Sequence, residues 1–153
     1  ANYGALSDQT VAAALTDNDT AGFTKSTSSV TVTEAAGGSN TATFTVVLDS
    51  EPSSGTVVID VTSGTTGQAT VSPSSLTFTT GNWDDTQTVT VTGVDNDVDG
   101  SNAGSTVTLS VNDGGPADAK YDAVHDQPVA ADATDNATAG LQTSALRGTA
   151  TEE

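Results

Sequence analysis

The sequence predicts an all-β protein, an antiparallel β-sandwich of about seven strands. Thr, Ser, Gly, Val and Asp are abundant in the chain, whereas the helix-forming residues Lys and Glu are scarce. Apolar and polar residues alternate over short runs, which is the period of a half-buried strand. Turn-forming residues separate these runs at the short, regular spacing that is typical of sandwiches.

The alternation predicts strands at residues 29–33, 41–48, 56–62, 69–71 with a short continuation at 75–79, 86–94, 106–112 and 128–134. One face of each strand is apolar and should point into the core. These inward residues are Val30, Val32, Ala42, Phe44, Val46, Leu48, Val57, Ile59, Val61, Val89 and Val91. Aromatic residues make up only 4% of the chain, so the core must consist mainly of small aliphatic side chains.

An internal repeat divides the chain. YGALSDQTVAAALTDNDTAGF begins at Tyr3, and YDAVHDQPVAADATDNATAGL begins at Tyr121, a constant offset of 118 residues without a gap. This period is too long for a solenoid turn and suits a string of sandwich domains. We therefore expect residues 1–22 to be the last strand and linker of a preceding repeat and residues 23–140 to be one complete repeat. Residues 141–153 would begin a following repeat or form a disordered tail.

The charge balance excludes several partners. Three Lys and Arg residues face twenty Asp and Glu residues, which gives a net charge of −17. Nucleic acids and anionic membranes require a cationic surface, so neither is an expected partner. Cysteine is absent, which excludes disulfides. The acidic excess favours a bound cation that relieves the mutual repulsion.

Strand direction predicts where the acidic residues meet. If successive strands alternate in direction, Glu34, the turn at Gly64–Gly67, the run Asp95–Asp99 and Asp135 share one end of the sandwich. Asp95-Asn96-Asp97-Val98-Asp99-Gly100 has the D-x-D-x-D-G pattern that opens many Ca²⁺ loops. Thr106 stands where an EF-hand has its last ligand, so this is not an EF-hand. The alternative is an ordinary Asp/Asn/Gly turn between two strands.

Three segments resemble the Calx-β family. They are VTVTEAAGG at residues 30–38, SSLTFTTGNWDDTQTVTVTGVDNDVDG at residues 74–100, and the pair TDNDTAG and TDNATAG at residues 16–22 and 134–140. The resemblance implies a Ca²⁺-binding immunoglobulin-like sandwich. Such domains occur in tandem in sodium–calcium exchangers and in large bacterial surface adhesins, and the Thr- and Asp-rich style here is similar to the adhesin branch.

The resemblance also implies a ligand set of Glu34, Asp95, Asp97, Asp99 and Asp135. Asn136, Asp17 and Asp19, in the two terminal acidic segments, are further candidates. Asp60 is a candidate too, because it should point outward near that same end of the sandwich, at the end of the strand at residues 56–62. The chain departs from the family pattern in two places. Residues 69–72 carry no acid where the family often has one, and the terminal triplet is Asp135-Asn136-Ala137 rather than three acids. Fewer or weaker ions are implied. Asp118, Asp122 and Asp126 are either a second, weaker site or a solvated acidic loop.

The expected function is structural rather than enzymatic. The module would be an extender in a long, repetitive adhesin on a bacterial cell surface, where Ca²⁺ rigidifies each domain and its joint to the next. Its partners would be neighbouring repeats of the same chain, and the isolated module would be monomeric. The alternative is an extracellular module that recognises a glycan or a protein through its loops or Trp83. The outward threonines at positions 88, 90 and 92 raise ice binding as a further alternative.

Overall fold

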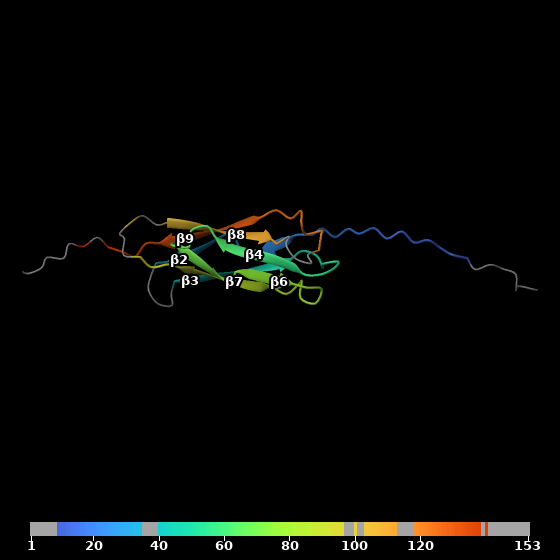
Figure 1. Cartoon of the computed structure of the whole chain (residues 1–153), viewed down its shortest axis with the longest axis horizontal. Helices are drawn as coiled ribbons and strands as arrows, with labels where there is room; N and C mark the ends of the chain where they lie inside the picture. Colours follow the sequence, from blue (N-terminus) through green and yellow to red (C-terminus); the bar gives the residue numbers. More distant parts are fainter. Residues whose placement is uncertain are drawn as a thin grey trace, which may run out of the picture.

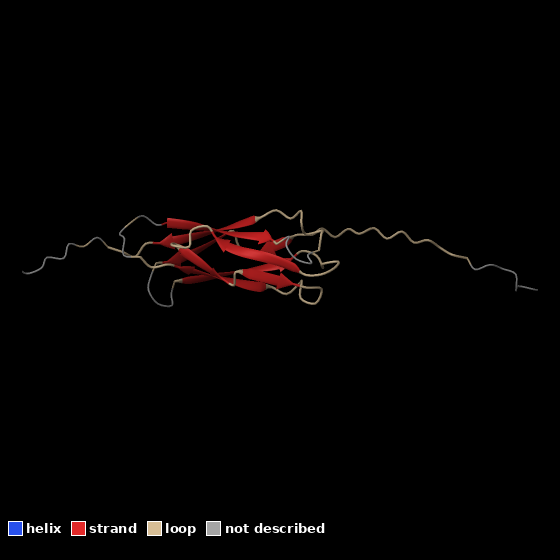
Figure 2. Ribbon diagram, in the orientation of Figure 1, coloured by secondary structure: helices blue, strands red, loops and turns tan. Residues whose placement is uncertain are grey.

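The computed structural model describes residues 9–34, 40–96, 100, 103–112, 118–138 and 140. This part of the chain contains nine strands and no helix (Figures 1 and 2). The strands are β1 (Phe23–Lys25), β2 (Ser29–Thr33), β3 (Thr41–Leu48), β4 (Val57–Ser63), β5 (Ala69–Ser72), β6 (Ser75–Phe78), β7 (Gln87–Gly93), β8 (Ala103–Val111) and β9 (Gln127–Thr134). The described residues include no helix that is long and apolar enough to cross a membrane.

Two sheets face each other and confirm the predicted sandwich (Figure 2). One has the order β1-β3-β7-β5, and the other has the order β2-β9-β8-β4-β6. The strand number exceeds the expected seven for two reasons. The three-residue β1 is too short to give an alternating pattern, and the run at residues 69–78 divides into β5 in one sheet and β6 in the other.

The expectation of a purely antiparallel sandwich is wrong at one pair. β2 runs parallel to β9, with Val30 opposite Ala131 and Thr33 opposite Thr134. The cause lies in residues 26–28, over which the chain crosses from one sheet to the other without reversing. Phe23 already lies beside the start of β9, because Gln127 Nε2 donates a hydrogen bond to its carbonyl at 2.8 Å.

The core follows the predicted alternation. Of the expected inward residues, all are buried except Ala42, which is half-buried and packs against the others. The core is completed by Phe23, Ala69, Leu76, Phe78, Val107, Leu109, Tyr121, Val129, Ala131 and Ala133. On the outer face of β7, Thr88, Thr90 and Thr92 lie opposite threonines of β3.

The sandwich has two poles. We call the end at which residue 22 enters β1 the N-terminal pole, and the end at which β2, β7 and β9 finish the C-terminal pole. β5 and β6 both pair antiparallel with strands that run toward the C-terminal pole, so the segment from residue 69 to residue 78 changes sheet without changing direction. The alternation of strand direction is therefore preserved. Residues 9–22 and residues 135–138 leave the sandwich at opposite poles (Figure 1).

Candidate functional site

Glu34 is a buried carboxylate at the C-terminal pole. It directly follows β2, and its N–H donates a 3.0 Å hydrogen bond to the carbonyl of Thr134, which continues the parallel pairing by one residue. Its residue surface is only 3% exposed. Oε2 accepts a 2.9 Å hydrogen bond from Nδ2 of Asn96, so the acidic run after β7 meets the end of β2.

Gly93 makes this close approach possible. A Cβ at this position would overlap the backbone carbonyl oxygen of Thr33 and crowd the side chain of Val32. Asn40 fixes the same point from the other side, because its Nδ2 donates to the Gly93 carbonyl and its own carbonyl accepts from the Gly93 N–H, each at 2.8 Å. The end of β7 is thus pressed against β2, and the following residues reach Glu34. Sequence reasoning did not single out Gly93, although a glycine that ends a strand is a known sign of close backbone approach.

Asp135 closes the other side of the acidic run. Its Oδ2 accepts a 2.7 Å hydrogen bond from the N–H of Gly100, and its Oδ1 accepts a 2.8 Å hydrogen bond from the N–H of Ala137. These two backbone donors hold the pKa of the Asp135 carboxyl below its ordinary value. The D-x-D-x-D-G segment therefore begins beside Glu34 and ends beside Asp135. Asp97 and Asp99 lie outside the described residues.

The structure brings together some of the expected ligands. Glu34, Asp95 and Asp135 lie at the C-terminal pole, with the exposed Asn136 next to Asp135. Asn96, which was not among the expected ligands, lies with them. The turn at Gly64–Gly67 is there too, because the adjacent Gln68 accepts a backbone hydrogen bond from Val94 at 3.0 Å.

Three other candidates lie elsewhere. Asp60 is opposite Ser110 within β4, and its Oδ2 accepts a 2.7 Å hydrogen bond from Asn112, beyond the N-terminal-pole end of β8. The prediction that Asp60 lies near the C-terminal pole is wrong, because the residue is in the middle of β4 and its side chain bonds toward the other pole. Asp17 and Asp19 lie on the segment that leads into β1, at the N-terminal pole.

The donors at the C-terminal pole are oxygens, which suit a hard cation such as Ca²⁺. Besides the carboxylates, Oε1 of Gln68 is buried there and has no hydrogen-bond partner in the described structure. No three acidic or histidine side chains of the described residues come close enough together to enclose an ion by themselves. The chemistry of the donors fits Ca²⁺, and a complete ligand set requires further oxygens.

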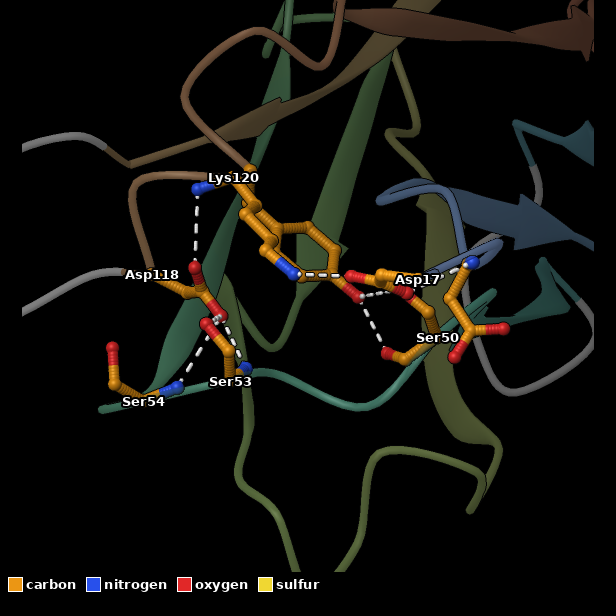
Figure 3. Close-up of polar contacts among 8 residues, drawn as sticks. Asp17, Ser50, Ser53, Ser54, Asp118 and Lys120 are labelled. Carbon is orange, nitrogen blue, oxygen red and sulfur yellow. Dashed lines mark hydrogen bonds and ion pairs between the residues drawn. The ribbon is translucent and has the colours of Figure 1, made fainter. Parts of the chain in front are cut away.

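The N-terminal pole is organised around a different carboxylate. Asp118 is 2% exposed. Its Oδ2 accepts hydrogen bonds from the N–H and hydroxyl of Ser53 and from the N–H of Ser54, and its Oδ1 accepts one from the N–H of Lys120 at 3.0 Å (Figure 3). Burial opposes ionisation by desolvation, but these donors outweigh it and hold the pKa of Asp118 below its ordinary value.

Asp118 is therefore a buried link between two loops, and the interpretation of this residue as part of a solvated acidic loop is wrong. Tyr121 strengthens the same link, since its hydroxyl donates to the carbonyl of Ser50 at 2.5 Å. Asp122 and Asp126 are exposed, as a solvated loop predicts. No local sequence pattern relates residues 50–54 to residue 118, so sequence reasoning missed the link.

Lys120 connects this pole to the segment before β1. Its Nζ forms a 2.8 Å ion pair with Oδ2 of Asp17, whose Oδ1 accepts from the N–H of Asp19 at 3.1 Å (Figure 3). The Lys120 hydrogen bond, the Asp19 N–H and the ammonium charge lower the pKa of Asp17, and the same pair raises that of Lys120. Asp17, Asp19, Glu51 and Lys120 line an open hollow of about 320 Å³.

Comparison with known proteins supports the fold. No family model matches the sequence, and no curated protein matches it. Among solved structures, the apo form of the Calx CBD1 domain is similar with a TM-score of 0.53 and 15% identity, over 77% of this chain and 99% of that chain. The periplasmic chaperone SfaE has a TM-score of 0.54 and 9% identity, over 82% of this chain, and the E. coli chaperone DraB has a TM-score of 0.51 and 9% identity, over 77%.

The alignments span 61% of SfaE and 57% of DraB, which is less than two thirds of each chaperone. At these identities the similarity concerns the fold alone. The chain has a β-sandwich fold of the kind found in Calx-β domains and in periplasmic chaperones.

Proposed function

We propose that this chain is a Ca²⁺-binding structural module of a long, repetitive extracellular protein, of the bacterial surface-adhesin type, and that it has no catalytic role. The observation that carries the proposal is the environment of Glu34. This carboxylate is buried at the pole where the chain leaves the sandwich, and it faces the start of the D-x-D-x-D-G segment. An isolated buried charge is costly unless it is paired or binds a metal.

The carboxylates at this pole make a cation favourable. Glu34 and Asp135 hold the two ends of a segment that contains Asp95, Asp97 and Asp99. Carboxylates gathered at one pole repel one another, and Ca²⁺, which takes six to eight oxygen ligands, relieves the repulsion. Bound Ca²⁺ would supply the positive charge that stabilises Glu34 and would fix the segment between β7 and β8 against the end of β9.

The joint between repeats supports a role in a tandem array. Asp17 and Asp135 occupy equivalent positions in the internal repeat, and each accepts a hydrogen bond through Oδ1 from the N–H two residues later. Asp17 also pairs with Lys120 of the sandwich that follows it. Only residues 18–22 separate Asp17 from β1. A linker this short does not behave as a free coil, so Ca²⁺ at the joint would stiffen the array into a rod.

The recognition alternative has less support. Trp83 is partly buried and packs against the core, and its carbonyl accepts a hydrogen bond from Leu48 at 3.2 Å. The part of Trp83 that packs against the core is not available for stacking on a sugar.

The proposal is tested by thermal melting and calorimetric titration of the whole chain. Ca²⁺ at 100 times its dissociation constant should stabilise the fold by about 2.7 kcal/mol, which raises the melting temperature by several degrees. Mg²⁺ should substitute poorly because it prefers a tighter octahedron. Glu34→Gln and Asp135→Asn should weaken Ca²⁺ binding, whereas Asp122→Asn, which removes an equal charge at the other pole, should not. Identical melting curves in Ca²⁺ and in chelator would refute the proposal.

The rod is tested separately, by small-angle X-ray scattering of four joined repeats with and without Ca²⁺. Removal of Ca²⁺ should shorten the maximum dimension of the array, because a flexible chain extends only with the square root of its length. An unchanged dimension would refute the rod and leave Ca²⁺-dependent stability untouched.

A further inference from the structure

One buried oxygen at the C-terminal pole has no partner in the protein. Oε1 of Gln68 is enclosed, yet no hydrogen bond reaches it, and it is the single buried side-chain atom of this kind in the described part of the chain. Burying a hydrogen-bond acceptor without a partner is costly, so native proteins rarely contain such atoms. The position of this oxygen therefore indicates a partner that the protein itself does not supply.

The donors next to Gln68 are already used. Its own N–H donates to the carbonyl of Thr65 at 3.0 Å, and its own carbonyl accepts from the N–H of Val94 at 3.0 Å. The hydroxyl of Ser63, which reaches the residue after Gln68, donates to the carbonyl of Ala69 at 2.6 Å. The backbone of the turn and its serine thus have no donor left for Oε1.

The acidic side chains of this pole cannot serve as donors either. Glu34, Asp95 and Asp135 lie at the same pole, and ionised carboxylates accept hydrogen bonds but donate none. Val94, which bonds to the Gln68 carbonyl, directly precedes Asp95, so the orphan oxygen belongs to a residue adjoining the acidic run. A buried water can donate to one such oxygen, but only a cation satisfies this oxygen and neutralises the carboxylates together.

We propose that Oε1 of Gln68 is a neutral ligand of the cation at the C-terminal pole and that this residue sets how tightly the cation binds. The inference rests on the proposed Ca²⁺ site and adds a residue to it. Ca²⁺ accepts amide oxygens as well as carboxylates, and its affinity for a site depends on the number of charged ligands. Glutamine supplies an oxygen without adding to the repulsion among the carboxylates when the cation is removed.

Two substitutions separate a ligand from a purely structural residue. Gln68→Met keeps the length of the side chain and removes the oxygen, so the Ca²⁺ affinity should fall about tenfold. Its melting temperature in chelator should equal or exceed that of the wild type, because an apolar group has no unsatisfied acceptor. Gln68→Glu adds a charged ligand of nearly the same shape, so the Ca²⁺ affinity should rise about tenfold. In chelator it should melt lower, because one more carboxylate joins Glu34 and Asp95.

Calorimetric titration of the whole chain with Ca²⁺ measures these affinities, and circular dichroism in chelator shows whether each variant is folded. Thr77→Glu is the matched control, because it adds the same charge at an exposed position of β6 near the N-terminal pole and should leave the affinity unchanged. In the ¹³C-labelled wild type, Ca²⁺ should shift the side-chain carbonyl resonance of Gln68, which either variant identifies by its loss. The corresponding resonance of Gln127, at the other pole, should not move.

The outcomes distinguish this inference from the Ca²⁺ site itself. If the wild type binds Ca²⁺ and Gln68→Met binds it equally tightly, Gln68 is not a ligand although the site stands. A Gln68→Glu variant without a gain in affinity, or a Gln68 carbonyl resonance that ignores Ca²⁺, would overturn the inference in the same way, and both measurements remain decisive if the methionine variant does not fold. A wild-type chain that binds no Ca²⁺ would overturn the site and the inference together.

Discussion

Replacing Asp118 with alanine should destabilise the sandwich, because it removes the buried acceptor that links two loops at the N-terminal pole. The carboxylate is buried and accepts hydrogen bonds from the backbone of residues 53, 54 and 120 and from the Ser53 hydroxyl. Each hydrogen bond to a charged group contributes about 1.5–3 kcal/mol, and the donors left behind lose their partner. Water entering the vacated space recovers part of this loss. We expect a net loss of about 3 kcal/mol in the free energy of unfolding.

The assay is urea or thermal unfolding followed by circular dichroism. At roughly 4 °C per kcal/mol for a domain of this size, the melting temperature should fall by about 12 °C. Asp122→Ala is the matched control, because it removes an exposed carboxylate from the same loop. The melting temperature of Asp118→Asn, which keeps one acceptor oxygen, should lie between those of Asp118→Ala and Asp122→Ala. A melting temperature of Asp118→Ala equal to that of Asp122→Ala would refute the assignment of Asp118 as a structural link.

The dependence on pH gives a second reading of the same interaction. The hydrogen bonds hold the pKa of Asp118 below its value in the unfolded chain, which is about 3.9. Its contribution to stability is therefore fully present above that unfolded pKa and is lost as the pH falls through the lowered folded value. The difference in unfolding free energy between the wild type and Asp118→Asn should shrink below about pH 4. A difference that grows on acidification would contradict this.

Two further substitutions test the packing of the sandwich. Gly93→Ala should cost about 2–4 kcal/mol, because the new Cβ meets the backbone of Thr33, whereas Gly67→Ala, with no atom near its Cβ, should be nearly neutral in a chemical denaturation series. Val129→Asp should prevent folding because it places a charge in the core, whereas Val11→Asp, at the equivalent but exposed position, should leave the melting temperature of the monomer unchanged.

Alternating patterns made most of the fold predictable. The predicted bounds of β2 and β3 match the structure, because both strands have one buried and one solvated face along their whole length. β1 has three residues and leaves no periodic pattern. The parallel pairing of β2 with β9 depends on a change of sheet at residues 26–28, and nothing in the local sequence distinguishes that change from a simple continuation of the strand.

The C-terminal pole was predictable to the extent that it depends on strand direction. Alternating directions place Glu34 beside the residues after β7 although 62 positions separate Glu34 from Asn96, and the structure contains this contact. The prediction for Asp60 was only half correct. Its side chain is on the outer face of β4, as expected, but the residue lies in the middle of the strand and not near its C-terminal-pole end. Asp118 was missed because its partners at residues 53 and 54 come from another loop, and burial of a loop carboxylate leaves no trace in the sequence nearby.

The two buried carboxylates lead to one last prediction. Asp118 and Glu34 are 2% and 3% exposed, yet their surroundings differ. Asp118 accepts four hydrogen bonds, whereas the carboxylate of Glu34 accepts one among the described residues, from the neutral amide of Asn96. The desolvation of Glu34 is thus less well compensated, and other acidic residues follow next to Asn96.

Glu34→Gln should consequently act in opposite directions in the two states of the protein. In chelator, glutamine removes a buried charge and its repulsion, so the melting temperature should rise above that of the wild type. In Ca²⁺, the same variant loses a ligand, so its melting temperature should fall below that of the wild type. Asp122→Asn removes an equal charge far from this pole, and it should shift the melting temperature in the same direction in chelator and in Ca²⁺. A Glu34→Gln variant that is destabilised equally in chelator and in Ca²⁺ would contradict a role of Glu34 in binding a cation.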